Sequence, residues 1–286
     1  MPNPRIIHSF GMGLAFMITL VLLLKNDKVA GLNVNRDQSL NKRELTARAG
    51  GAVPVYSTCR TPGSFALTFD DGPYNFGSKL DKTLDASNAK ATFFVNGNNY
   101  GCIYDYADVL LERFNKGHLI AGHTWSHVHL NEGSYQQISH QLEVLETAMI
   151  KILGVKPKYM RAPYGEYNDL VLQVLSDRGY KGMIMWSQDA EDSLDSPASP
   201  SQIIESYKSY PEKTIVLNHE TKESTVNEVM PRVIPILKQR GFSLKTVPDC
   251  LNLGSNPRDW YVSVQKPGSR DKTWTCNGTP EPGKFE

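Results

Sequence analysis

The chain has 286 residues, 40% of them hydrophobic, which is enough apolar material for one sizeable core. It carries 31 basic and 30 acidic residues, for a formal net charge of +1, and no block of basic residues stands out. We therefore expect no nucleic-acid partner, because binding to phosphates requires clustered Lys and Arg side chains. A near-neutral surface is compatible with a neutral substrate such as a sugar polymer.

Residues 1–24 predict a targeting signal, either a signal peptide or a signal anchor. The apolar run 10–24 is shorter than the ~20 residues that comfortably span a bilayer, so a secretory signal peptide is the preferred interpretation. An uncleaved anchor is the alternative, because Ile6 and Ile7 would lengthen the run. Such an anchor would be the one expected contact with a membrane.

Residues 25–56 predict a flexible leader, since they are polar, poor in aromatic residues and unpatterned. Within them, Lys42 and Arg43 form a dibasic pair of the kind that processing proteases of the secretory pathway cut. The alternative interpretation is two exposed charges. Together with the signal, this leader favours a secreted protein, located outside the cell or in the cell wall.

The four cysteines predict two disulfides in an oxidising compartment. They are Cys59, Cys102, Cys250 and Cys276, and no C-x-x-C pair occurs, which disfavours a cysteine zinc site. Three pairings are possible. Because Cys59 lies just before the first predicted strand and Cys250 just after the last, we favour Cys59–Cys250, which leaves Cys102 with Cys276.

The C-terminal tail, 253–286, is rich in Gly and Pro and is expected to be exposed. It contains the sequon Asn277-Gly278-Thr279, which predicts N-glycosylation at Asn277 in a secreted protein.

Between the leader and the tail, short apolar runs alternate with longer amphipathic ones. The apolar runs predict strands over 65–69, 91–95, 119–122, 158–161, 182–186, 214–218 and 243–247. The amphipathic runs predict helices over 77–87, 104–116, 134–153, 168–178, 201–209 and 224–240. This alternation predicts a single α/β domain over 57–252, with a parallel sheet that is either open and doubly wound or closed into a barrel.

Two of the predicted helices carry clear local signals. The helix over 134–153 begins with a capping box made by Ser134 and Gln137 and ends before Gly154. The helix over 224–240 contains Pro231 and Pro235, which predict a kink.

Ionisable side chains follow several predicted strands at their carboxyl ends. They are Asp70 and Asp71, His123, Arg161, Asp189 and His219. Because the carboxyl ends of parallel strands meet at one edge of a sheet, and sites of α/β folds lie there, we expect these side chains to form one site. No G-x-G-x-x-G follows any strand, so a dinucleotide site is not expected.

The histidines His123 and His127 predict a metal site. If their turn is helical, the i, i+4 spacing places both imidazoles on one face. With Asp71 they would make the two-imidazole, one-carboxylate set typical of catalytic zinc. Thr124 replaces the Glu of an H-E-x-x-H protease, so the general base must come from elsewhere, and Asp70 is the candidate. We expect one divalent ion, Zn²⁺ or alternatively Co²⁺; the other interpretation is two structural histidines.

The remaining strand ends predict a hydrolytic mechanism. A guanidinium at Arg161 would hold Asp70 ionised and aimed, and the backbone N–H of Tyr164 could face a developing oxyanion. His219, paired with a carboxylate such as Asp189, would stay protonated and act as general acid. These parts together predict metal-assisted hydrolysis of an amide or an ester.

Five segments, in this order, resemble the polysaccharide deacetylases of carbohydrate esterase family 4, the NodB-homology domain. They are Thr68-Phe69-Asp70-Asp71-Gly72-Pro73, His123-Thr124-Trp125-Ser126-His127, Arg161-Ala162-Pro163-Tyr164-Gly165, Asp189-Ala190-Glu191-Asp192 and Leu217-Asn218-His219. The resemblance covers about 57–252 and implies a distorted (β/α) barrel with about seven parallel strands.

The resemblance also implies a role for each matching residue. The implied metal ligands are Asp71, His123 and His127. It implies that Asp70 is the base and is positioned by Arg161, and that His219 is the acid and is tuned by Asp189. Tyr164 and Leu217 are implied to contact substrate, and the backbone of Tyr164 to bind the oxyanion.

One residue departs from the pattern of the family. The fourth motif usually continues with Trp, a residue that lines the groove, and Ser193 stands there, which affects substrate fit more than chemistry. The leader, the dibasic pair and the sequon resemble fungal members, which implies a monomeric chitin deacetylase that releases acetate from N-acetylglucosamine units and leaves chitosan. Alternatives are a deacetylase of acetylxylan or peptidoglycan, or a non-catalytic glycan-binding protein. Trp125 is expected to pack in the core.

Overall fold

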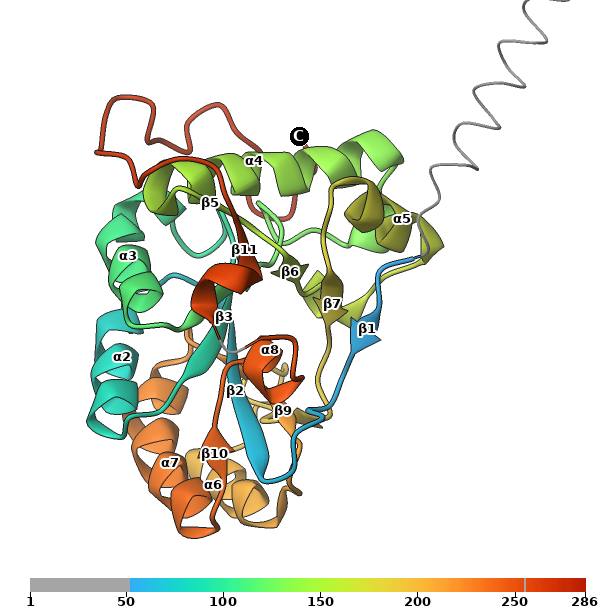
Figure 1. The fold of residues 1–286 in the computed structure, drawn as a ribbon. Coiled ribbons are helices and arrows are strands. Elements are labelled where there is room, and N and C mark those ends of the chain that lie inside the picture. The colour runs from blue at the N-terminus through green and yellow to red at the C-terminus, as the bar shows by residue number, and fades with distance from the viewer. Residues whose placement is uncertain (1–51, 255) are drawn as a thin grey trace, which may run out of the picture. The chain divides into compact units, whose positions relative to one another are not determined.

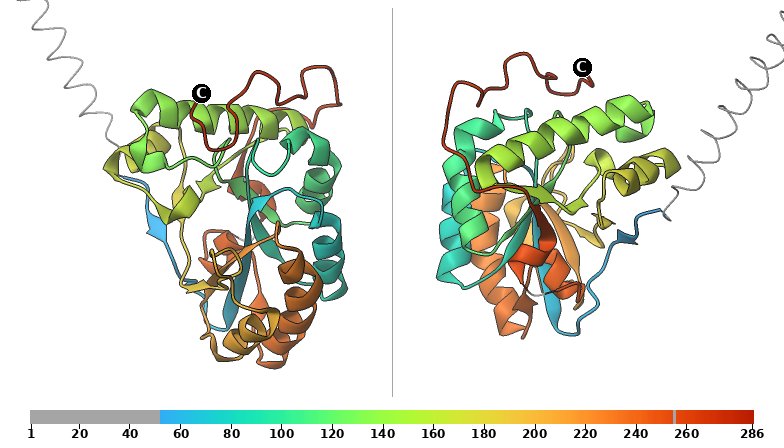
Figure 2. Two further views of the ribbon diagram at one scale, coloured as in Figure 1. Left: turned by 180° about the vertical axis from the view of Figure 1, so that it is seen from behind. Right: turned by 45° about the horizontal axis from the view of Figure 1, so that its top comes forward.

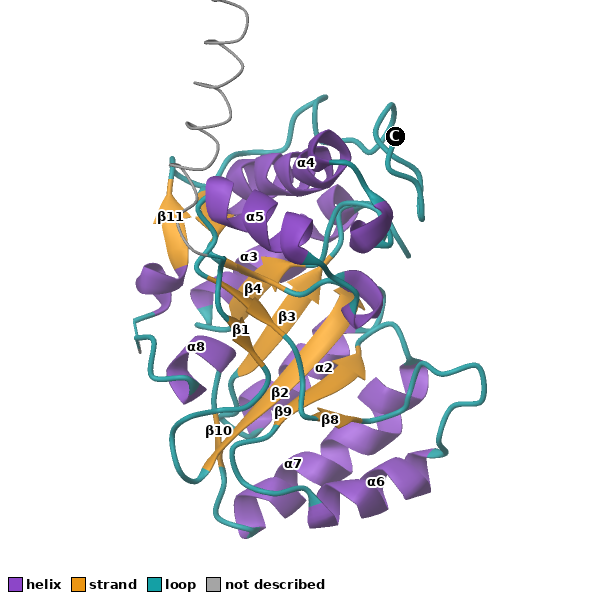
Figure 3. Ribbon diagram, turned by 90° about the vertical axis from the view of Figure 1, so that its right-hand side faces the viewer, coloured by secondary structure: helices purple, strands orange, loops and turns teal. Residues whose placement is uncertain are grey.

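A parallel β-sheet forms the centre of the fold and is surrounded by helices (Figures 1 and 3). The computed structural model describes residues 52–254 and 256–286. The predicted signal, 1–24, and the predicted leader as far as residue 51 lie outside the described residues. Within the described part of the chain, no helix is long and apolar enough to cross a membrane.

The sheet runs in the order β1-β7-β6-β4-β3-β2-β9-β8, with β10 paired to β2. Its strands are β1 (Val55–Tyr56), β2 (Ser64–Gly72), β3 (Ala91–Val95), β4 (Leu119–Gly122), β6 (Tyr159–Met160), β7 (Gly182–Ile184), β8 (Gln188–Asp189), β9 (Ile215–His219) and β10 (Ser243–Leu244). All neighbours are parallel. The two edges of the sheet are β1 and β8, which do not pair with each other, so the barrel stays open between them. The expected distorted (β/α) barrel is confirmed.

The helices agree with the amphipathic runs. They are α2 (Gly77–Ala86), α3 (Ala107–Asn115), α4 (Tyr135–Leu153), α5 (Asp169–Asp177), α6 (Pro200–Ser209) and α7 (Met230–Gln239). The short α8 (Val247–Cys250) was not predicted, and it begins at the last residue of the predicted strand 243–247. The predicted capping box at the start of α4 is present, and Gly154 ends that helix with a left-handed backbone at φ 76°. The predicted helix 224–240 is divided into a π-helical turn, Thr225–Val229, and α7, so Pro231 lies in the first turn of α7, where its missing N–H costs least.

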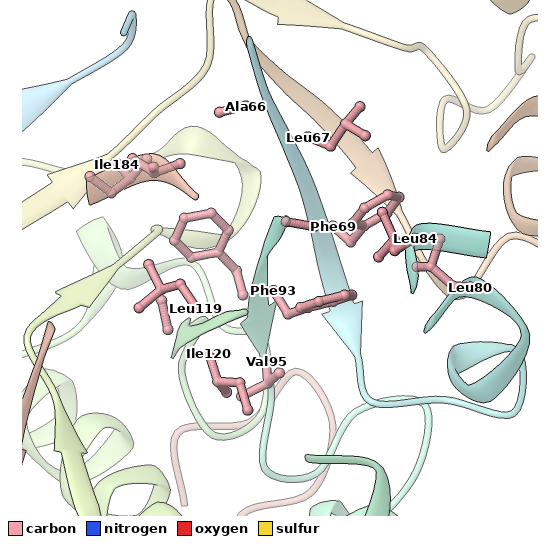
Figure 4. Close-up of a cluster of buried hydrophobic side chains, with 14 of the residues drawn as sticks. Ala66, Leu67, Phe69, Leu80, Leu84, Phe93, Val95, Leu119, Ile120 and Ile184 are labelled. Carbon is pink, nitrogen blue, oxygen red and sulfur yellow. The ribbon is translucent and has the colours of Figure 1, made fainter. Parts of the chain in front are cut away.

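Strand β2 is buried along its whole length and organises the core. Leu67 and Phe69 face α2, whose Leu80 and Leu84 lie on the same side of the strand, while Ala66 lies on the other side (Figure 4). This alternation is the period of two that any strand imposes. Strands that are buried on both faces are near-continuous apolar runs. The run 65–69 therefore allowed most of β2 to be predicted from the sequence.

Both disulfides form as predicted. Cys59 is bonded to Cys250 and Cys102 to Cys276. The first joins the segment before β2 to α8, at the end of the barrel where β2 begins. The second joins the loop after β3 to the C-terminal tail.

Two boundaries differ from expectation. Residues 55 and 56, placed in the leader, form β1 and pair with β7. The tail is not simply exposed, because β11 (Tyr261–Ser263) pairs antiparallel with β5 (Val155–Pro157), and Trp260 and Tyr261 are buried. A run rich in Gly and Pro carries no helix or strand period, so its attachment to the barrel was not visible in the sequence.

Candidate active site

The carboxyl end of β2 brings two adjacent aspartates to one cavity. Asp70 lies on the same face of β2 as Thr68, and both contact one guanidinium. The pairing register with β3 shifts between Asp70 and Gly72, and Asp71 has a left-handed backbone (φ 68°), so its carboxylate reaches the same cavity. Gly72 is needed for packing, since a Cβ there would lie 1.9 Å from Glu220 Oε1.

Arg161 fixes one oxygen of Asp70. It is fully buried, and its Nη1 donates to Asp70 Oδ1 at 2.7 Å and to Thr68 Oγ1 at 2.8 Å. Its other donors are held by the backbone carbonyls of Ile184 and Met185, each at 3.1 Å. The guanidinium therefore cannot swing away, and Asp70 keeps Oδ2 available on the cavity side. The predicted contact between Arg161 and Asp70 is present, while its catalytic purpose stays a prediction.

The two histidines of the second motif lie in a loop after β4, and the helical turn expected between them is absent. Instead, Thr124 (φ 69°) and His127 (φ 56°) have left-handed backbones. This geometry still brings the imidazoles of His123 and His127 together, with ring centres 5.0 Å apart. The expectation of one shared face was right, but its structural reason was wrong.

Asp71, His123 and His127 form a group suited to a divalent ion, with candidate ligand atoms all within 4.8 Å of one another. Asp71 Oδ1 lies 3.1 Å from His127 Nε2 and 3.6 Å from His123 Nε2. This oxygen is buried and accepts no hydrogen bond from any residue that the structure describes. An unsatisfied buried carboxylate oxygen facing two imidazoles fits a cation between them.

The histidine tautomer supports the same interpretation. His123 Nδ1 lies 2.9 Å from the carbonyl oxygen of Arg161, which can only accept, so Nδ1 carries the proton and Nε2 is free to bind a metal. Burial lowers the pKa of His123 to about 4, which keeps the ring neutral. Burial by itself would raise the pKa of Asp71, but the imidazoles of His127, His123 and His219 bring it below its usual value. Both residues are therefore in the protonation state that a metal ligand requires.

His219 is paired with Asp192 across a loop. His219 Nδ1 lies 2.7 Å from Asp192 Oδ1, and the His219 backbone N–H donates to Asp192 Oδ2 at 2.9 Å. Thr225 donates to the same Oδ2 at 2.6 Å. Burial alone would lower the pKa of His219, but the hydrogen bond and charge of Asp192 raise it to about 9. The ring is thus an imidazolium at neutral pH. Its other nitrogen, Nε2, is not bonded to Asp192 and lies 3.4 Å from Ser193 Oγ, and both residues line the cavity.

Asp189 is not the carboxylate hydrogen-bonded to His219, so the prediction named the wrong acid of the fourth motif. Asp189 ends β8 opposite Leu217, two residues before His219, and its Oδ1 accepts from Glu191 N at 2.7 Å. A left-handed backbone at Glu191 (φ 58°) then turns the chain, and Asp192 reaches the histidine. In the sequence, the position of Asp189 at a strand end favoured it as the partner of His219. The turn at Glu191 makes Asp192 the partner instead.

The predicted site residues line one cavity of about 670 Å³. Besides Asp70, Asp71, His123, His127 and His219, its lining includes Tyr164, Asp189, Ser193 and Leu217. Tyr164 has a left-handed backbone (φ 59°), and its ring packs against His127 and stacks on His129. Arg161 lies beneath the cavity, and Trp125 is buried in the core, as expected.

Comparison with known proteins agrees with this geometry. Residues 57–183 match the sequence profile of the family described as Polysaccharide deacetylase. A chitin deacetylase of Pestalotiopsis sp is 37% identical over 220 residues, which cover 74% of this chain and 72% of that protein. The chain belongs to the polysaccharide deacetylase family.

Two further relatives of this polysaccharide deacetylase are named for different polymers. A probable peptidoglycan-N-acetylglucosamine deacetylase of Arthroderma benhamiae is 36% identical over 225 residues, 77% of this chain but 51% of that protein. The solved structure of the chitin deacetylase from the fungal pathogen Colletotrichum lindemuthianum has a TM-score of 0.70 at 33% identity, covering 74% of this chain and 97% of that one. The fold is therefore that of a family 4 carbohydrate esterase.

Four residues important to the polysaccharide deacetylase site were not assigned from the sequence. They are Thr68, Asn96, Asp192 and Glu220. Asn96 donates from Nδ2 to the carbonyl oxygens of His123 and Thr124 and so supports the histidine loop. Asn96 follows β3 directly, so the strand-end rule could have selected it. Thr68 is the first residue of the first motif and Glu220 directly follows the fifth, but neither carries a pattern that indicates a role.

Proposed function

We propose that this protein hydrolyses N-acetyl groups of N-acetylglucosamine units in chitin, giving chitosan and acetate. The observation that carries the proposal is that Asp70 and His219 line one cavity together with the group Asp71, His123 and His127. A fixed carboxylate and a protonated imidazole beside a cation site are the parts that amide hydrolysis needs. The relatives named chitin deacetylase support the choice of polymer.

The reaction forms a C–O bond to the acetyl carbon and breaks its C–N bond. Asp70, held through Oδ1 by Arg161, takes a proton from the attacking water. His219 gives its Nε2 proton to the leaving nitrogen, while Asp192 holds Nδ1 and stabilises the charged ring. The chemistry that a divalent ion supplies when bound by Asp71 and the two histidines is polarisation of the acetyl carbonyl and of the water.

The other roles belong to the same proposal. The backbone N–H of Tyr164 donates to the oxyanion, and Tyr164 and Leu217, which line the cavity, contact the sugar. The ion is Zn²⁺, with Co²⁺ as a substitute. Two disulfides support secretion to the cell wall or outside the cell. The proposal also includes a monomer, a signal in 1–24 and a glycan on the exposed Asn277.

The test is mass spectrometry of a chito-oligosaccharide after incubation with the enzyme. We expect loss of acetyl groups with the chain length kept, and no loss after chelation or in Asp70→Asn. Shortened sugars would identify a glycosidase, and binding without acetate release would identify a glycan-binding protein. Parallel incubations with acetylxylan and peptidoglycan rank the substrates, and a higher kcat/KM on either would overturn the assignment to chitin.

A further inference from the structure

The last part of the C-terminal tail runs back over α4 to the loop that carries the two histidines. Figure 2 shows the tail crossing α4, and its contacts run from Lys151, near the end of that helix, to Gln141. We call residues 276–286 the strap. None of the five family motifs includes them.

The histidine loop, 123–127, needs support from outside itself. Two of its residues, Thr124 and His127, have left-handed backbones, a conformation that is unfavourable for residues with a Cβ. Such a conformation persists only where surrounding contacts enforce it. The loop after β3 supplies some of them, because Gly97 N and Asn98 N both donate to the carbonyl of Trp125.

The strap holds the indole at the centre of that loop. Trp125 Nε1 donates to Thr279 Oγ1 at 3.1 Å and to the carbonyl of Pro280 at 3.2 Å. Asn98 Nδ2 donates to the same carbonyl at 3.1 Å. The ring has no freedom to move, since a Cβ at Gly97 would lie 1.8 Å from it. Its buried N–H therefore depends on the strap for its acceptors.

The strap also holds the residue before His127. Gly283 N donates to the carbonyl of Ser126 at 2.6 Å, and Ser126 Oγ donates to the carbonyl of Lys284. Gln141 on α4 completes the network, because it accepts from Ser126 N at 3.0 Å and donates to the Lys284 carbonyl at 3.0 Å. The backbone on the N-terminal side of the left-handed His127 is thus tied to elements outside the loop.

A disulfide ties the strap to the barrel at its other end. Cys276 is bonded to Cys102, in the loop that follows β3. Thr279 Oγ1 donates to the carbonyl of Cys276, so the bond to Trp125 and the disulfide share one turn of the chain. The strap is therefore fixed at Cys276 and again at Lys284, with the histidine loop between.

We propose that the strap is a positioning element that holds His123 and His127 in the geometry that binds a divalent ion. The proposal rests on the metal site of the proposed function. Contacts behind metal ligands commonly control affinity by 10–100-fold. The strap supplies such contacts through Trp125 and Ser126.

The first test replaces Thr279 by Val, which removes one of the two acceptors of the Trp125 N–H at constant shape and leaves the carbonyl of Pro280 as the other. Asn277→Gln is the matched control, because both changes abolish the sequon and only Thr279→Val breaks the contact; Thr279→Ser keeps it. Zn²⁺ affinity is measured by competition with a chromophoric chelator, and amide exchange of 123–128 is followed in the metal-free protein. We expect Thr279→Val to weaken Zn²⁺ about fivefold and speed exchange, with both other variants unchanged.

The second test compares the two disulfides. They close loops of similar sequence separation, 174 residues for Cys102–Cys276 and 191 for Cys59–Cys250, so their removal restores similar entropy to the unfolded chain. We expect the double Ser variant of Cys102 and Cys276 to weaken Zn²⁺ at least tenfold, and the variant of the other pair to bind normally. Equal Zn²⁺ affinity in Thr279→Val and Asn277→Gln would overturn the strap's role. A wild type that binds Zn²⁺ but releases no acetate would instead overturn the proposed function.

Discussion

Replacement of Asp192 by Asn isolates the electrostatic part of the His219 pair. An amide oxygen can still accept from His219 Nδ1, so the ring keeps its orientation while the negative charge is lost. In the intact protein Asp192 overcomes the burial of His219 and raises its pKa from 6.5 to about 9, a stabilisation of the imidazolium worth about 3 kcal/mol. Without that charge, burial remains, and the pKa should fall to 6.5 or lower.

The expected consequence is a change in the pH profile of kcat/KM. At pH 8 the protonated fraction of His219 falls from about nine-tenths to about one-thirtieth, so kcat/KM should drop roughly 30-fold in Asp192→Asn. At pH 5.5 the ring is protonated in both enzymes, and the two should differ little. The matched control is Asp189→Asn, which removes a neighbouring carboxylate that is not hydrogen-bonded to the histidine.

The alkaline limb of the kcat/KM profile should move to lower pH in Asp192→Asn and stay at the same pH in Asp189→Asn. The opposite result in either variant would refute this reasoning. Proton titration of His219 by NMR in the metal-free enzyme gives a second readout. Because the folded pKa of His219 lies above 6.5, its protonation stabilises the fold fully below pH 6.5, and this stabilisation is lost as the pH rises through about 9. Urea unfolding should therefore show a larger penalty for Asp192→Asn at pH 6 than at pH 9.5.

Three further changes have defined outcomes. Arg113→Met leaves Glu220, fully buried and 2.7 Å from the lost guanidinium, without its counter-ion, and should destabilise the fold by about 3–5 kcal/mol in urea unfolding; Glu220→Gln in the same background should recover part of the loss, and no recovery would contradict the pairing. Asp71→Asn should weaken Zn²⁺ at least tenfold in chelator competition, whereas Asp70→Asn should bind Zn²⁺ normally and lose turnover; the reverse would exchange their roles. Ser193→Ala removes a hydroxyl 3.4 Å from His219 Nε2 and should lower kcat/KM about fivefold if His219 is the general acid; an unchanged value would show that the contact is passive.

Most of the fold could be predicted because its signals are local. The capping box of Ser134 and Gln137, the stop at Gly154 and the apolar run of β2 each act within a few residues of the chain. The meeting of Asp70 and His219 was also predictable, although they are far apart in the sequence. Parallel strands bring their carboxyl ends to one edge, so strand order hardly matters to the argument.

Tertiary structure decided the features that depend on how turns aim side chains. The choice of Asp192 over Asp189 rests on the left-handed Glu191, and the shared site of His123 and His127 on a loop that is not helical. The attachment of the strap rests on hydrogen bonds between segments with no periodic pattern. The sequence by itself determined the α/β class with its parallel sheet and the edge where the site lies, because these follow from local periodicity and from strand ends. The barrel was implied by the resemblance to the family, and the favoured disulfides by the places of Cys59 and Cys250 beside the first and last predicted strands. Which carboxylate pairs with His219, and what holds the loop of His123 and His127, depend on backbone angles that only the packed chain sets.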